Sequence, residues 1–277
     1  MNTPIASQNF NNLNSDSTFT DDNFPSGSQD QLLTNESSLN QDGPGINFQT
    51  FWTDTRGNKG PLSGSESGDF IGVNSFSGSN APNVSPDGTA VSAGVEQNFE
   101  FNDGDGRLDL TFAPIDLSGF NNRILSFDYW INETGFESND AFTATLSDGN
   151  QTTTLLSFSE SQLEANTSAD DGSANWNTVK FDLESAIASA GLDPSNMALT
   201  ISADTNSGSE NIFVDNVLFA EGDGTDEGNG SNFGIQESFE SEPGTTYTLS
   251  NPFDDGSFDY FDRYAVPNDS NAARDDF

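Results

Sequence analysis

The chain has 277 residues with 45 acidic and 7 basic side chains, a formal net charge of −38, and neither histidine nor cysteine. These absences exclude histidine- and cysteine-based zinc, copper, haem, triad and thiol chemistries, because histidine is the usual proton shuttle near pH 7 and cysteine the common thiol nucleophile. The charge repels nucleic acid and anionic membranes, whereas the abundant carboxylate, amide and hydroxyl oxygens are the ligands that calcium prefers.

The N-terminal segment does not have the features of a secretory signal. Residues 1–22 lack both the basic start and the apolar run of a signal peptide, and no stretch of the sequence is apolar and long enough to span a membrane. Without cysteine, metal ions would have to replace disulfides as cross-links in an exported protein. We therefore expect an extracellular or cell-surface bacterial protein that is exported by a signal-peptide-independent route, without membrane insertion.

Short runs of alternating apolar and polar residues recur through the first 220 residues. This two-residue period predicts β-strands, and the Gly, Asn, Asp and Ser turns between them are typical of a β-sandwich. In the last run, we expect Ile212, Val214 and Asn216 on one face, opposite Phe213, Asp215, Val217 and Phe219. The strands are predicted at Gly68–Val73, Val95–Asn102, Arg107–Phe112, Ile124–Ile131, Ala141–Leu146, Thr153–Phe158, Thr178–Leu183, Met197–Ala203 and Asn211–Phe219.

One surface helix and a second module are also predicted. Leu183, Ile187 and Ala190 recur at helical spacing within Asp182–Ala190, and Gly191 follows as a stop signal. The apolar-free run EGDGTDEGNG after residue 220 predicts a flexible acidic linker. Beyond it, ESFES at 237–241 is similar to QNFNN at 8–12 and suggests a tandem repeat. We therefore expect a sandwich domain at 1–220, a linker at 221–232 and the partial start of a related β module at 233–277, in a fragment of a longer polypeptide.

Three runs carry a resemblance to a known class of module. They are WTDTRGNKGP with SGSESGDFIGV (52–73), NIFVDNVLFAEG (211–222) and the start of the predicted second module at 237–263. Together they resemble the jelly-roll β-sandwich modules of multidomain secreted proteins from marine bacteria and cyanobacteria, which are similar to calcium-containing carbohydrate-binding modules. The resemblance implies an all-β antiparallel jelly roll with an accessory role. It also implies a calcium shared between the first and last strands, with Asp215 as the last-strand ligand and Glu240 as the first-strand acid of the second module. The first-strand counterpart in the first module is Asn11, which is neutral.

The best local cluster of oxygen ligands is NDGDGRLD at 102–109. Asp103 and Asp105 alternate there, and the glycines would let the backbone wrap around an ion, as at the start of an EF-hand loop. The glutamate that such a loop needs at its twelfth position is missing. The competing interpretation, which we favour, is an Asp-Gly hairpin between the strands that end at Asn102 and begin at Arg107.

Other conspicuous residues have competing interpretations. Trp52 and Trp176 occur in loop-like contexts and could stack on sugar rings, whereas Trp130 lies in a strand and is expected in the core. Arg56, in a Gly-rich loop of a very acidic chain, is expected to pair with nearby carboxylates rather than with a ligand. We found no strand motif of sandwich-fold glucanases, no nucleophile elbow and no phosphate-binding loop.

Three functional hypotheses follow. The leading one is a non-catalytic, calcium-stabilised interaction or spacer module of a large secreted or surface protein. The second is polysaccharide binding through loop aromatics. The third is an accessory region of an extracellular hydrolase, a nuclease or phosphatase, whose catalytic domain lies beyond residue 277. The expected cofactor is calcium, and the expected partners are a polysaccharide or a surface protein.

Overall fold

Two antiparallel sheets form the part of the chain that the computed structural model describes. That part comprises residues 2–11, 18–20, 31–36, 45–53, 55–56, 70–74, 82, 84–86, 97–104, 106–132, 135–167 and 176–222, all within the N-terminal unit Met1–Asn232. The predicted second module at 233–277 and nearly all of the predicted linker lie outside the described residues.

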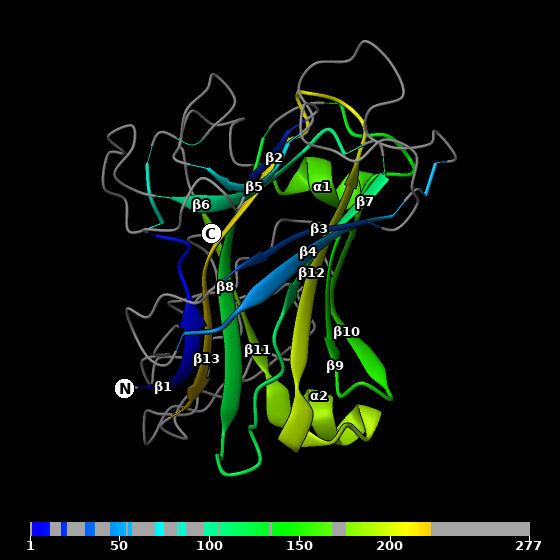
Figure 1. Cartoon of the computed structure of the whole chain (residues 1–277). Coiled ribbons are helices and arrows are strands. Elements are labelled where there is room, and N and C mark those ends of the chain that lie inside the picture. Colours follow the sequence, from blue (N-terminus) through cyan, green and yellow to red (C-terminus); the bar gives the residue numbers. More distant parts are fainter. Residues whose placement is uncertain are drawn as a thin grey trace, which may run out of the picture. The chain divides into compact units, whose positions relative to one another are not determined.

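The first sheet has seven strands in the order β11-β8-β13-β6-β5-β2, with β1 paired to the C-terminal half of β13. The second has six strands in the order β10-β9-β12-β7-β4-β3 (Figure 1). The strands of the first sheet are β1 Thr3–Gln8, β2 Thr18–Thr20, β5 Phe70–Asn74, β6 Asn98–Asn102, β8 Arg123–Ile131, β11 Asn177–Asp182 and β13 Ile212–Glu221. Those of the second are β3 Gln31–Glu36, β4 Phe48–Thr53, β7 Gly106–Phe112, β9 Ala141–Ser147, β10 Thr152–Ser159 and β12 Ala198–Thr205.

Consecutive strands from β6 onward pass repeatedly between the two sheets, and this alternation is the expected antiparallel jelly-roll sandwich, which is confirmed. All nine predicted strands are present, with bounds that differ by a few residues at most. Four strands in the first 53 residues, β1 to β4, were not predicted. The core lies between the sheets and is rich in phenylalanine; the rings of Phe10, Phe48 and Phe99 have centroids 5.5 to 5.9 Å apart.

The predicted alternation of the last strand is wrong at one point. The register of β13 shifts between Asp215 and Leu218, where Asn216 adopts a φ of 50°. This bulge adds a residue and reverses the alternation, so that Val217 and Phe219 join Ile212 and Val214 in the core. Phe213 and Asp215 remain on the outward face.

The predicted hairpin between β6 and β7 is also wrong, because these strands belong to different sheets. The connection crosses from one sheet to the other and is packed against the end of β4. The indole nitrogen of Trp52 donates to the carbonyl oxygen of Gly104 at 2.7 Å. At Gly106 a Cβ atom would lie 2.6 Å from the carbonyl oxygen of Thr53, so the close approach of these backbones requires glycine.

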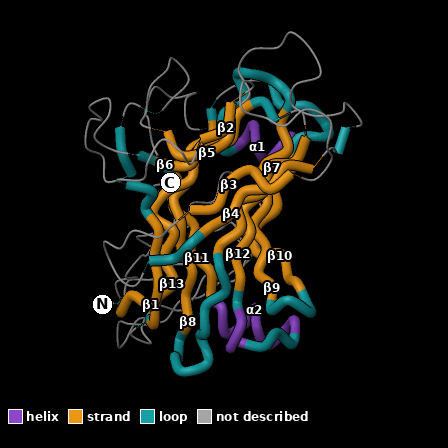
Figure 2. Tube along the Cα trace, viewed as in Figure 1, coloured by secondary structure: helices purple, strands orange, loops and turns teal. Residues whose placement is uncertain are grey.

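Short helices adjoin the strands (Figure 2). The predicted helix is confirmed as α2, Leu183–Ala190: Asp182 caps its N-terminus, and Gly191 ends it with a φ of 66°. The helix α1, Glu160–Ala165, and the 3-10 turn η3, Pro194–Asn196, were not predicted. Both α-helices insert leucines into the core. None of the helices in the described residues is long and apolar enough to cross a membrane.

Candidate metal centre

Two connections meet at one end of the sandwich: residues 132–140, between β8 and β9, and residues 206–211, between β12 and β13. The backbone nitrogen of Asn132 donates to the carbonyl oxygen of Asn211 at 2.9 Å, and its side-chain nitrogen donates to that of Ser209 at 2.9 Å. The peptide nitrogen of Glu210 donates to the carbonyl oxygen of Ser207 at 2.8 Å, which closes a tight turn. The two loops are therefore joined by hydrogen bonds from the backbone and the side chain of Asn132.

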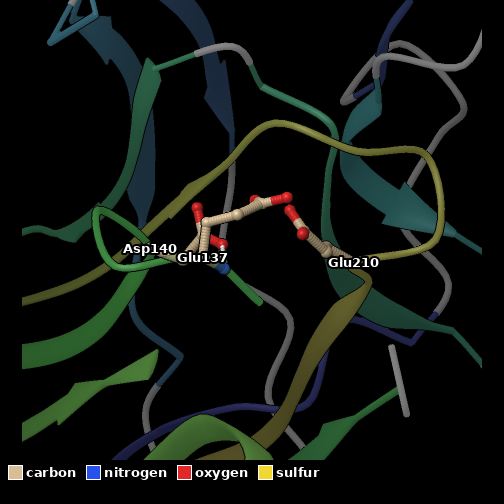
Figure 3. Close-up of side chains that lie close together, drawn as sticks. All are labelled: Glu137, Asp140 and Glu210. Atoms are coloured by element: carbon tan, nitrogen blue, oxygen red, sulfur yellow. Dashed lines mark hydrogen bonds between the residues drawn. The ribbon is translucent and has the colours of Figure 1, made fainter. Parts of the chain in front are cut away.

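Three acidic side chains converge where these loops meet. Glu137 and Asp140 come from the first loop and Glu210 from the second, and one carboxylate oxygen of each lies within 4.8 Å of the others. Figure 3 shows the carboxylates of Glu137 and Glu210 directed toward each other. We call these three residues the acidic triad. Within the described part of the chain, this is the group of acidic side chains whose oxygens lie close enough together to hold one metal ion.

Glu210 is the most constrained member of the triad. It is only 1% exposed, and its Oε2 accepts a hydrogen bond from the backbone nitrogen of Asn206 at 3.0 Å. Its Oε1 is buried and has no hydrogen-bond partner among the described residues. Burial, together with the charges of Asp140 and Glu137 and a side-chain hydrogen bond that Glu210 and Glu137 can share through one proton, raises the pKa of Glu210 to about 7. A buried carboxylate with an unsatisfied oxygen is costly unless a proton or a cation compensates it.

Arg56 borders the acidic triad and neutralises part of it. Its Nη2 lies 2.6 Å from Asp140 Oδ1 and 2.9 Å from Asp204 Oδ1. Burial opposes the charge of Arg56, but the hydrogen bonds and charges of these two aspartates raise its pKa. With its amide oriented to satisfy both neighbours, Asn206 donates to Glu137 Oε2 at 2.8 Å and accepts from Arg56 Nη1 at 3.0 Å. The acidic triad and Asp204 together have four carboxylates, and Arg56 has the one guanidinium beside them. When all of these groups are ionised, their net charge is −3.

The geometry suits a cation better than catalysis. Paired carboxylates of similar separation act in glycoside hydrolysis, but the free oxygen of Glu210 is too deeply buried to reach a glycosidic bond. Calcium binds oxygen ligands at about 2.3 to 2.6 Å, so ligands on opposite sides of one ion lie about 5 Å apart. The spacing of the acidic triad therefore fits three ligands around a single calcium ion.

The residues predicted to bind calcium lie elsewhere. Asp215 is 5% exposed on the outward face of β13, opposite Asp128 of β8, and its Oδ1 accepts from the backbone nitrogen of Asn216 at 2.7 Å. The side-chain oxygen of Asn11 accepts from the backbone nitrogen of Gln97 at 2.8 Å. Neither belongs to the acidic triad, and their role as calcium ligands stays a prediction.

Asp103 lies closer to the triad but is not part of it. It is 5% exposed with a φ of 49°, and it borders the loop that carries Glu210, since a Cβ on Gly208 would lie 3.4 Å from Asp103 Oδ2. The other two residues predicted as ligands, Asp105 and Glu240, lie outside the described residues.

The tryptophans divide between core and surface. Trp52 is 0% exposed in the core, so its predicted sugar-stacking role is corrected: no ring face is available to a ligand. Trp130 is buried as expected, but on the outward side of its sheet, against Phe213 at 5.5 Å between centroids. Trp176 is partly exposed, and its indole nitrogen donates to the carbonyl oxygen of Val84 at 2.8 Å. Its ligand role stays a prediction.

Sequence reasoning missed all three members of the acidic triad. Each lies close to a strand end, Asp140 directly before β9 and Glu210 two residues before β13. Acidic residues are common beside turns in this chain, so position alone did not distinguish them. Only the sheet topology shows that these two connections lie at the same end of the sandwich.

A scan against protein-family models found no match, and a search of curated proteins also found none. The solved structures that are similar include TmCBM61 in complex with β-1,4-galactotriose, at 15% identity and a TM-score of 0.33, covering 55% of this chain and 82% of that one. A family 30 carbohydrate-binding module of a Clostridium thermocellum cellulosomal cellulase aligns at 12% identity and 0.36, covering 71% and 99%. The K1 cleaved adhesin domain of Lys-gingipain from Porphyromonas gingivalis aligns at 13% and 0.35, covering 78% and 97%.

Proposed function

We propose that the sandwich is a non-catalytic interaction module of a secreted or cell-surface protein, and that a calcium ion bound by Glu137, Asp140 and Glu210 stabilises it. The observation that carries this proposal is the buried Oε1 of Glu210, which no hydrogen-bond donor contacts in the described part of the chain, on a carboxylate that faces that of Glu137 (Figure 3). A divalent cation would satisfy this oxygen and offset the repulsion between Glu210 and Glu137.

The chemistry of the ligand set favours calcium over other metals. All three side chains offer only hard oxygen atoms, and the chain has no histidine or cysteine for zinc or copper. Each of the three carboxylates offers one oxygen to the ion, and calcium accepts six to eight oxygen ligands in flexible geometry. The ion would join the β8–β9 and β12–β13 loops, so that binding adds to the free energy of unfolding.

Several features agree with a role outside the cell. The chain is strongly acidic, with a formal net charge of −38, and calcium sites of extracellular modules are filled at millimolar free calcium. The partner would be a surface protein or a polysaccharide.

Thermal melts of the whole chain in excess calcium and in excess EDTA test the proposal. Calcium should raise the melting temperature of the wild type, and Glu210→Gln should abolish most of that rise. Glu164→Gln, an exposed glutamate of α1, is the matched control and should respond like the wild type. Magnesium in place of calcium measures selectivity. A wild-type melt that calcium leaves unchanged, or a full calcium response in Glu210→Gln, would contradict the proposal.

A further inference from the structure

Asp140 belongs both to the acidic triad and to a buried ion pair. Its Oδ1 accepts a hydrogen bond from Arg56 Nη2 at 2.6 Å, and its Oδ2 accepts one from the backbone nitrogen of Glu137. The carboxylate is therefore held by its own loop and by a guanidinium. Because the side chain of Asp140 is 0% exposed, these partners rather than bulk water compensate its charge. An ion bound at the acidic triad would have to share Asp140 with Arg56.

Arg56 is fixed beside the acidic triad. Its side chain is only 8% exposed, and its Nε donates to Asp204 Oδ1 on β12 at 2.9 Å. Asp204 is itself oriented by Thr55, whose Oγ1 donates to Asp204 Oδ2 at 2.6 Å. Anchored to both aspartates, the guanidinium keeps its position close to the acidic triad when an ion enters. It also keeps its charge, because arginine is not deprotonated in proteins.

The distance between Arg56 and a bound ion sets the size of their repulsion. Calcium binds carboxylate oxygens at about 2.3 to 2.6 Å, so an ion on Asp140 Oδ1 would lie about 5 Å or less from Arg56 Nη2. At that separation, a divalent and a monovalent cation repel each other enough to lower the affinity about tenfold, even at the dielectric constant of water. Burial of both side chains increases this repulsion, because the effective dielectric constant is lower there.

We propose that Arg56 sets the calcium affinity of the acidic triad, by competing with the ion for Asp140 and by repelling it. This role rests on the proposed calcium site and adds the residue that controls it. The number of charged ligands is one of the factors that tune calcium affinity, and Arg56 offsets one of three carboxylates. It therefore moves the site toward the weak affinities of extracellular modules. Bound calcium in turn compensates the charge of Asp140, which Arg56 alone compensates in the metal-free protein.

Urea unfolding of the whole chain over a series of calcium concentrations tests this role. The rise in the free energy of unfolding with free calcium gives the dissociation constant of the folded protein. In Arg56→Met this constant should fall at least about tenfold relative to the wild type, although the variant is less stable in EDTA. Arg107→Met is the matched control: it removes the same charge from an exposed pair and should keep the wild-type constant. Adding Glu210→Gln to Arg56→Met should abolish the calcium response, and a retained response would overturn the role.

Two further variants separate the charge of Arg56 from its contribution to packing. Arg56→Lys keeps the positive charge and loses the planar fork, so its dissociation constant should stay within about threefold of the wild type. Asp204→Asn removes a carboxylate that partly neutralises Arg56, so calcium should bind about threefold more weakly or worse. Glu164→Gln removes a carboxylate from an exposed position and should leave the constant unchanged. A purely structural role of Arg56 would instead give equal or weaker calcium binding in Arg56→Met.

The outcomes distinguish this role of Arg56 from the calcium site on which it depends. A calcium response in the wild type, with an unchanged or larger dissociation constant in Arg56→Met, would overturn the role and leave the site standing. No response in the wild type or in any variant would overturn both. A response in Arg56→Met but not in the wild type would support the role and contradict the wild-type calcium site. If Arg56→Met does not fold in EDTA, Asp204→Asn takes its place, and unchanged or tighter binding by that variant would overturn the role.

Discussion

Arg56 and Asp140 form a buried ion pair with 2.6 Å between Nη2 and Oδ1, and their side chains are only 8% and 0% exposed. The pair joins the segment after β4 to the turn before β9. The sequence-based expectation that Arg56 pairs with carboxylates is confirmed. Because removal of one partner leaves a buried charge without compensation, such a pair is far more sensitive to substitution than an exposed one.

We therefore expect Arg56→Met to lower the free energy of unfolding by about 3 to 5 kcal/mol in EDTA. Arg107→Met is the matched control, because Arg107 is 46% exposed in its pair with Asp109, and it should cost about 1 kcal/mol or less. Urea unfolding of both variants measures the difference. Equal losses of unfolding free energy in the two variants would contradict this expectation, because they would show that Asp140 does not need Arg56 to compensate a buried negative charge.

The pH dependence of the metal-free protein should report on Glu210. Its pKa rises from 4.5 to about 7 in the fold, so the folded state binds a proton that the unfolded state has released. Stability from this group is therefore present at low pH and is lost as the pH rises from about 4.5 to about 7, by no more than about 3 kcal/mol. Urea unfolding in EDTA below and above this window should show the loss in the wild type. Glu210→Gln should show a smaller loss, and an identical pH profile would contradict the assignment.

Substitution of Asp215 distinguishes the proposed calcium site at the acidic triad from the one that the resemblance implies. If the ion binds at the acidic triad, Asp215→Asn should keep the full calcium-induced rise in melting temperature, because its side chain lies on the outward face of β13 opposite Asp128. A variant that loses the rise would instead place the ion between the first and last strands, as the resemblance in the sequence implies. Differential scanning calorimetry in calcium and in EDTA measures the rise for Asp215→Asn and Glu210→Gln in parallel.

Trp52 should contribute to stability rather than to ligand binding. Trp52→Phe leaves a cavity in the core and removes the 2.7 Å hydrogen bond to the carbonyl oxygen of Gly104, so we expect a loss of about 2 to 4 kcal/mol. Trp176→Phe removes a hydrogen bond at a partly exposed position and should cost about 1 kcal/mol. Urea unfolding ranks the two variants, and a greater loss for Trp176→Phe would be inconsistent with these environments.

Local patterns in the sequence predicted a large part of this fold. Alternating residues identified the strands from β5 to β13, because a strand that is buried on one face must repeat every two residues. The spacing of Leu183, Ile187 and Ala190, followed by Gly191 as a stop signal, marked α2, because one face of a helix repeats every three to four residues. The first strands were missed: β1 reads TPIASQ, in which proline and small residues weaken the pattern.

What the sequence determined by itself was the all-β class, the absence of histidine and cysteine chemistry, and a surplus of carboxylates. Tertiary structure decided where those carboxylates meet. The bulge at Asn216 reverses the faces of β13, and the crossing after Asn102 sends β7 into the other sheet. Glu137 and Glu210 approach each other only because the chain brings two distant loops to one end of the sandwich. Local patterns record the period of each strand, whereas the meeting of two loops depends on which strands pair, and pairing is fixed by packing of the whole core.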